Sequence, residues 1–262
     1  MRSGSFTANT LGVLTIGGSV VAGTAAHTGE LFFGEIRGAV SIGGDLAGQA
    51  NHRAVLITVG AFDNVSLPRV SIGGSVRFAD VLFGFEPGRI PRGSFTRIGS
   101  LCVAGAWMAG NLSVGINAGD DGVFGTADDR YNSPDSTIPP PSIGHLEIGG
   151  RILGTADGAD AFGIVASRIG ELIVEGRNRP LAPGAGNDNF ALGTPGDIRL
   201  REVPRPVKRS PVFTRPRPQP RGRRRASPGA PAAGSSATGA RRPARRSDRS
   251  KRTSRRVSRS GW

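Results

Sequence analysis

The chain has 262 residues, a formal net charge of +14 and a single cysteine. We therefore expect neither an internal disulfide framework nor a cysteine metal site. The sequence contains no run of 18 apolar residues, so it predicts no membrane-spanning helix.

The charge is divided unevenly near residue 203. Residues 1–203 hold 15 arginines, no lysine and 19 acidic residues, a net charge of −4. Residues 204–262 hold 17 arginines, 2 lysines and one acidic residue, a net charge of +18. The positive charge therefore belongs to the C-terminal tail, and residues 1–203 are the predicted folded domain.

A seven-residue phrase recurs along this domain, with apolar residues at its first and third positions and then a glycine pair. Full copies begin at Leu14, Val40, Val70 and Leu146, a degenerate copy begins at Leu101, and a truncated copy begins at Leu172. The alternation is typical of a short strand with one buried face. The glycines predict a turn of the chain, and the apolar residue at the seventh position predicts a second strand after that turn.

The spacing of the phrases indicates a solenoid. Their third positions are residues 16, 42, 72, 103, 148 and 174, so the steps are 26, 30, 31, 45 and 26 residues. Frequent glycines argue against helical repeats, and four of these steps are too short for a four-stranded propeller blade of about 40–45 residues. The sequence therefore predicts an all-β fold, a right-handed parallel β-helix over residues 1–203.

Stacked coils place equivalent side chains in columns inside the stack. The first expected column is Leu14, Val40, Val70, Leu101, Leu146 and Leu172, and the second is Ile16, Ile42, Ile72, Val103, Ile148 and Val174. A third, three residues upstream, is Leu11, Leu67, Ile98, Ile143 and Ile169. The residues between the first two columns, including Cys102 and Glu147, are expected to face outward. Residues 54–59 and 162–165 are expected to supply another strand in their coils.

The longest insertion, residues 117–142, is called the acidic loop below. Its candidate ligands for a metal ion are Asn117, Asp120, Asp121, Asp128 and Asp129. Clustered carboxylates repel one another unless they are solvated or neutralised, and a cation that takes six to eight oxygen ligands, such as calcium, is the usual neutraliser. The match to an EF-hand loop is partial, because Gly119 occupies the third ligand position. A solvated acidic hairpin without a metal is the alternative.

Other candidate sites are less specific. His27, His52 and His145 have no companion at metal-ligand spacing, so we interpret them as solvated or structural. A second set lies in adjacent predicted coils and combines acids with cations: Glu147, Glu171, Arg151, Arg168 and Arg177. Such a set resembles the sites of pectate-lyase-like β-helices, which implies polysaccharide cleavage as an alternative function.

The tail, residues 204–262, is rich in arginine and proline and is expected to be disordered. Its arginine clusters favour binding of polyanions or nucleic acid, with Arg223, Arg224, Arg225, Arg241, Arg242, Arg245 and Arg246 as the candidate contacts. An out-of-frame translation of a GC-rich gene would have the same composition, and this alternative stays open.

The glycine-pair phrases and the acidic loop resemble β-strand-repeat proteins of planctomycete-like bacteria and autotransporter passengers. The resemblance covers residues 11–203. It implies a non-enzymatic, structural or adhesive segment of a secreted or cell-surface protein, stabilised by calcium. The expected partners are a cell-surface or extracellular polymer, or neighbouring repeats of a longer chain. Residues 11–22 have features of a secretory signal, but they carry a copy of the phrase and are interpreted as the first coil.

Overall fold

The computed structural model describes residues 4–25, 27–58, 65–85, 96–131, 139–155 and 160–205. These residues belong to the first of the two units into which the chain divides, Met1–Pro211 and Val212–Trp262. All regular elements within the described ranges are β-strands. None of these residues forms a helix that is long and apolar enough to cross a membrane.

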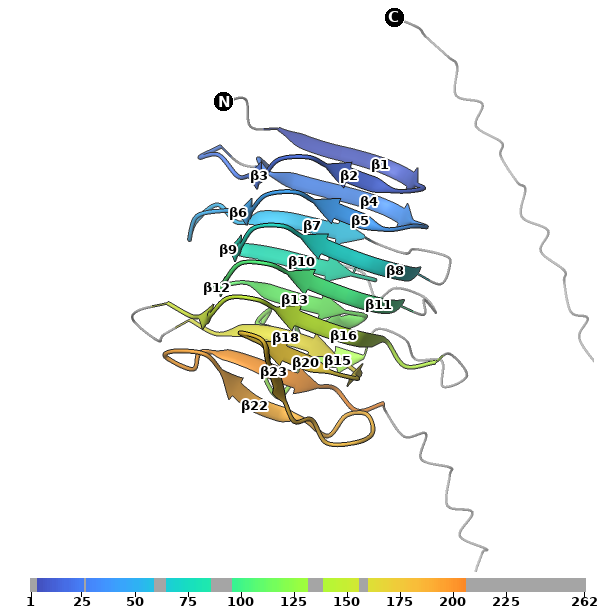
Figure 1. The fold of residues 1–262 in the computed structure, drawn as a ribbon, viewed down its shortest axis with the longest axis vertical. Coiled ribbons are helices and arrows are strands. Elements are labelled where there is room, and N and C mark those ends of the chain that lie inside the picture. Colours follow the sequence, from blue (N-terminus) through green and yellow to red (C-terminus); the bar gives the residue numbers. More distant parts are fainter. Residues whose placement is uncertain are drawn as a thin grey trace, which may run out of the picture. The chain divides into compact units, whose positions relative to one another are not determined.

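Three largely parallel sheets and one two-stranded antiparallel sheet make up the fold of the described residues (Figure 1). Sheet A contains, in spatial order, β1 (Ser5–Leu11), β4 (Glu30–Ile36), β7 (Ala54–Thr58), β10 (Ala79–Phe83), β13 (Asn111–Val114), β18 (Phe162–Ala166), β23 (Ile198–Glu202) and β22 (Asn189–Leu192). Sheet B contains β2 (Leu14–Ile16), β5 (Val40–Ile42), β8 (Val65–Ile72), β11 (Thr96–Val103), β16 (Ser142–Ile148), β20 (Leu172–Val174) and β21 (Arg177–Arg179), with β19 (Arg168–Ile169) also paired to β16. Sheet C contains β17 (Ile152–Leu153), β12 (Trp107–Met108), β9 (Val76–Arg77), β6 (Leu46–Ala47) and β3 (Val20–Val21).

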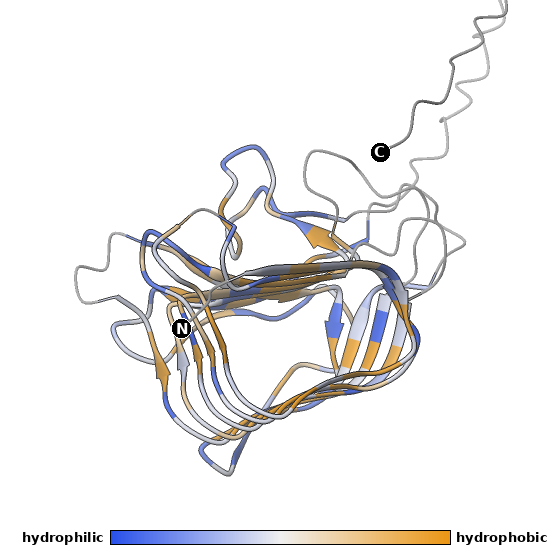
Figure 2. Cartoon of the chain, turned by 90° about the horizontal axis from the view of Figure 1, so that it is seen from above, coloured by the Kyte–Doolittle hydropathy of each residue, from blue (hydrophilic) through white to orange (hydrophobic). Residues whose placement is uncertain are grey.

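From β1 to β18 the chain visits sheets A, B and C in turn, apart from one antiparallel hairpin between β13 and β16, and from β4 on each strand of these sheets pairs in parallel with the equivalent strand of the preceding coil. Seen from above, the coils lie over one another around a common interior (Figure 2). The prediction of an all-β fold with parallel pairing between repeats is therefore confirmed. Residues 54–58 and 162–166 are strands of sheet A, as predicted.

The first two predicted columns are both present in sheet B. The register joins Leu14 to Val40, Val40 to Val70, and so on up to the pair Leu146–Leu172. The second column has the same register, and all of its members except the half-buried Ile16 are buried. Sheet C adds a column from the residues that follow the glycine pairs: Val20, Leu46, Val76, Trp107 and Ile152.

The third predicted column is correct only from the third coil onward. Leu67, Ile98, Ile143 and Ile169 are joined by register in sheet B. Leu11 instead ends β1 in sheet A, where it pairs with Ile36. In the first two coils the sheet B strands start at the phrase itself, whereas β8, β11 and β16 start several residues before it, so counting back from the phrase reaches sheet B only in the later coils.

The glycine pairs allow successive coils to pack closely at their corners. A Cβ atom added at Gly73 would lie 2.4 Å from the carbonyl oxygen of Gly43, and one at Gly43 would lie 2.5 Å from that of Gly17. Neither residue is among those with a positive φ. The glycines are therefore needed for the close approach of neighbouring coils rather than for a left-handed backbone.

At the C-terminal end of sheets A and B, the parallel pairing gives way to antiparallel pairing. After β20 the chain turns back, and β21 pairs antiparallel with β20. Strand β22 likewise pairs antiparallel with β23, the last strand to continue the parallel order of sheet A. The repeat phrases predict neither reversal, because both lie beyond the last phrase.

A second apolar cluster lies on the outer face of sheet A. Its buried members are Ile57, Leu82, Ile116, Phe124, Val165 and Val203. Leu82 is opposite Ile57 in the sheet register, whereas their neighbours Leu56 and Val81 belong to the main core. Strands β7, β10 and β18 therefore carry apolar residues on both faces, which is why they do not show the simple alternation of sheet B.

Candidate functional site

The described part of the acidic loop begins as a short hairpin. Strand β14 (Ile116–Asn117) pairs antiparallel with β15 (Arg130–Tyr131), so Asn117 is opposite Arg130. Between them, Phe124 is only 7% exposed and packs edge-on against Phe85, with the ring centroids 6.0 Å apart. The loop is therefore anchored to the outer face of sheet A by apolar contact.

Asp128 holds the turn of the acidic loop together. Its Oδ2 accepts hydrogen bonds from the backbone N–H groups of Asp120, at 2.7 Å, and Asp121, at 3.2 Å. Its Oδ1 accepts one from the Thr126 hydroxyl at 2.5 Å. These hydrogen bonds, that from Thr126 foremost, lower the pKa of Asp128 to about 2. Asp128 is therefore ionised and already has donors on both oxygens.

Asp129 is the buried carboxylate of the loop. Its Oδ2 accepts a hydrogen bond of 2.9 Å from the Gly125 N–H and lies 3.7 Å from Nε of Arg201. Its Oδ1 is buried and has no hydrogen-bond partner. Burial raises the pKa of Asp129 to about 7, because the charged form loses hydration that one hydrogen bond and one cation replace only in part.

The two remaining acids of the set have separate partners. Asp120 pairs with Arg130, and Oδ1 of Asp121 accepts a hydrogen bond of 2.8 Å from the Val123 N–H. Among the described residues, the groups of His, Cys, Asp and Glu whose ligand atoms converge do not include these acids. As arranged, the predicted ligands fit calcium poorly, since several of their oxygens would first have to leave protein donors.

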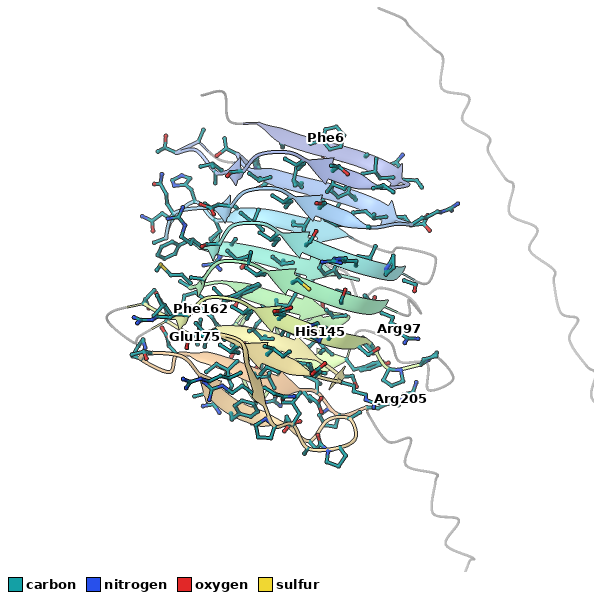
Figure 3. The ribbon with its side chains drawn as sticks, viewed as in Figure 1. Phe6, Arg97, His145, Phe162, Glu175 and Arg205 are labelled. Carbon is teal, nitrogen blue, oxygen red and sulfur yellow. The ribbon has the colours of Figure 1, made fainter. Side chains whose placement is uncertain are left out.

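A different cluster lies on the outer face of sheet B. The parallel register sets His145 opposite Ser100 and Glu147 opposite Cys102. Figure 3 labels His145 at the level of β16. Its Nδ1 lies 2.9 Å from Oε2 of Glu171 in the next coil, and its Nε2 lies 3.5 Å from Oε2 of Glu147.

The electrostatics of this cluster follow from those contacts. The hydrogen bond with Glu171, supported by Glu147, raises the pKa of His145. Burial, together with the nearby Glu147 carboxylate, raises the pKa of the Cys102 thiol. Spacing along the chain gives no sign of this cluster. Alignment of the repeated phrases does indicate the cluster, because Cys102 and Glu147 occupy equivalent positions in successive phrases.

The set proposed for polysaccharide cleavage is only partly assembled. Glu147 and Glu171 both contact His145, whereas Arg151 faces Glu175 at 3.8 Å. Arg168 and Arg177 are exposed. A pocket of about 610 Å³ does lie at the C-terminal end of the stack. It is lined by β17, β20, β21 and β22 and includes Arg151, Glu175 and Arg179.

The two other histidines each have a partner close by in the chain. His27 lies 3.1 Å from Glu30, and His52 forms a bridge with Gln49 at the corner after β6. The arginines of the tail that were predicted to bind polyanions all lie outside the described residues. No protein-family model matches the chain, and searches of curated proteins and of solved structures give no significant match.

Proposed function

We propose that residues 1–203 form a right-handed parallel β-helix that acts as a structural or adhesive segment of a secreted or cell-surface protein. The parallel register between successive coils supports the helix, and connections between parallel strands of one sheet are right-handed in about 98% of cases. The proposed partners are neighbouring repeats of the same type or an extracellular polymer.

One observation carries the structural role. Among the described residues, the large hydrophobic side chains that are exposed are Phe6, Val13 and Val21, at 51%, 60% and 50%. All three lie in the first coil, whose strands β1, β2 and β3 each end a sheet. Exposed strand edges with apolar side chains are ready to pair with a further strand. A further coil stacked on this end would cover both the edges and the side chains.

The test is to add such a coil. A copy of residues 30–53, which contains β4, β5 and β6, is fused ahead of residue 4. We expect a higher melting temperature and stronger hydrogen-exchange protection of the amides in β1–β3. The matched control carries Asp at the positions of Val40 and Ile42 in the added copy, because charged side chains cannot enter the columns. If β1–β3 exchange equally fast in both fusions, this end is not a stacking surface.

Cleavage of a polysaccharide is the alternative function. The pocket lined by Arg151, Glu175 and Arg179 supports it, because guanidinium groups can pair with the carboxylate of an acidic sugar and a side-chain carboxylate can serve as a general acid or base. Incubation with acidic polysaccharides should then release new chain ends, and Arg179→Ala should abolish that release. Binding to the polymer without release would favour the adhesive role.

Calcium stabilisation of the acidic loop is a further proposal. The unpartnered Oδ1 of Asp129 supports it, because a buried carboxylate oxygen without a donor gains most from a cation. The hydrogen bonds to Asp128 argue against calcium binding, since they already stabilise the charge of its carboxylate. Polyanion binding by the tail is proposed from its arginine clusters.

A further inference from the structure

Cys102, His145 and Glu147 bring three different metal ligands together on the outer face of sheet B. One ligand atom from each lies within 4.8 Å of the other two, and all three residues are half-buried. We propose that they form a binding site for a divalent transition-metal ion, for which Zn²⁺ is the best match. This proposal is independent of the structural role and of the calcium site.

The distances suit a tetrahedral ion. Zinc bonds to nitrogen, oxygen and sulfur are about 2.0–2.3 Å long, which places neighbouring ligand atoms about 3.3–3.7 Å apart. His145 Nε2 and Glu147 Oε2 are 3.5 Å apart, which is longer than a good hydrogen bond but close to this ligand spacing. Small side-chain rotations would bring the Cys102 sulfur into the same sphere.

The kind of ligand decides the kind of metal. A thiolate and an imidazole prefer zinc and similar borderline or soft ions, whereas calcium and magnesium prefer oxygen ligands alone. Three protein ligands leave one tetrahedral position for water or an exogenous ligand. The half-buried, solvent-facing position of the cluster leaves room for that fourth ligand.

Glu171 positions the histidine for this role. It holds Nδ1 of His145 at 2.9 Å, and its other oxygen accepts a hydrogen bond from the Asn178 side chain at 3.4 Å. A carboxylate on one imidazole nitrogen commonly orients a histidine whose other nitrogen binds metal. Here the other nitrogen, Nε2, is the one directed toward Glu147.

The sheet supplies the rigidity that a metal site needs. Cys102 and Glu147 are register partners in β11 and β16, and His145 is two residues before Glu147 on the same face. Glu171 comes from the coil after that of His145, and its carbonyl oxygen accepts a hydrogen bond from the Leu146 N–H. Because all these side chains face outward, the variants that remove them should leave the core intact.

The test uses the full chain without an affinity tag, freed of metal with a chelator and kept reduced. We expect one Zn²⁺ per chain by calorimetry, and one Co²⁺ with the intense visible bands of a tetrahedral ion and a thiolate charge-transfer band. Cys102→Ser should remove the charge-transfer band. His145→Gln and Glu147→Gln should each weaken binding at least tenfold, and Glu171→Gln by about 10–100-fold with the thiolate band retained.

Two controls separate this site from other metal binding. Ser71→Ala changes an outward residue of the same column, and Asp121→Asn with Asp128→Asn changes the acidic loop. Both should bind Zn²⁺ like the unchanged chain, and far-UV circular dichroism should be the same for all variants. The proposal is overturned if the chain binds no Zn²⁺ at micromolar concentrations, or if Cys102→Ser and His145→Gln leave its affinity unchanged.

Discussion

Ile72 lies directly opposite Ile42 in the parallel register of β5 and β8, and each side chain is 1% exposed. Ile72→Asp would place an unpaired carboxylate in this column, so we expect a loss of several kcal/mol of unfolding free energy. The neighbouring Ser71 faces outward, and Ser71→Asp should cost less than about 1 kcal/mol. Chemical denaturation of both variants measures the difference, and equal losses would contradict the assignment of inner and outer faces.

The columns of sheet B were predictable because one physical rule generates them. Alternation fixes which residues face inward, and the glycine pairs mark where coils approach most closely, so Val40, Val70 and Leu101 could be aligned without any contact information. Leu11 was misplaced because the connection between sheets A and B directly precedes the phrase in the first coil, whereas β8, β11 and β16 already belong to sheet B several residues before it. Local patterns do not report the length of a connection.

The candidate sites were less predictable, for two reasons. Phe124 lies in a glycine-rich and aspartate-rich segment, and nothing local indicates that it packs on sheet A. Cys102 and His145 belong to different coils, and the 45-residue step between their phrases hides their proximity. Contacts between parallel strands of successive coils follow the order of the strands in the sheet, so they become visible only when the coils are aligned.

The anchoring of the acidic loop by Phe124 can be tested directly. Phe124→Ala should remove about 3 kcal/mol of unfolding free energy, because the ring is buried against Phe85 and the second apolar cluster. Val123→Ala, at a half-buried neighbour, is the control and should cost less than about 1 kcal/mol. Hydrogen exchange at Ile116 and Tyr131 reports the hairpin, and unchanged protection in Phe124→Ala would show that other contacts hold the loop.

Glu202 should make stability depend on pH. Its carboxylate is buried, accepts hydrogen bonds from the Ile169 N–H at 2.6 Å and the Asn187 N–H at 3.3 Å, and lies near the Asp188 carboxylate. Burial raises the pKa of Glu202 above its ordinary value of 4.5. The folded state therefore binds the proton more tightly than the unfolded state, so stability falls as pH rises from 4.5 through the raised pKa.

The measurement is the melting temperature as a function of pH for the unchanged chain and for Glu202→Gln. The variant cannot ionise there, so its stability should fall less across that range. The control is Asp160→Asn, which removes an exposed carboxylate and should keep the original slope. An identical slope in all three proteins would mean that Glu202 keeps its ordinary titration on folding.

Removal of Val212–Trp262, which hold all the tail arginines predicted to bind polyanions, should leave the first unit unchanged. Truncation after Pro211, the boundary between the two units, should leave the melting temperature and the far-UV spectrum the same. Polyanion binding by the full chain should weaken steeply with added salt and be lost on truncation, because it depends on the release of counterions by arginine. A truncated chain that still bound heparin or DNA would place the binding on the first unit instead.

Calcium binding by the acidic loop is tested by a titration of thermal stability. Extracellular calcium modules commonly bind with dissociation constants of about 10⁻⁴–10⁻³ M, and the missing ligand at Gly119 argues for the weak end. At ten times the dissociation constant, binding would add about 1.4 kcal/mol of unfolding free energy. Asp121→Asn with Asp128→Asn should abolish this gain, and Asp160→Asn should preserve it.

Magnesium at the same concentration serves as the second control, because it keeps its waters and requires a tighter octahedral site. We expect it to give less stabilisation than calcium. If neither ion shifts the melting temperature at millimolar concentration, the contacts of Phe124 and Asp128 are sufficient to order the loop. The loop would then be a solvated acidic hairpin, and Asp129 would hold its Oδ1 in a buried position without a cation.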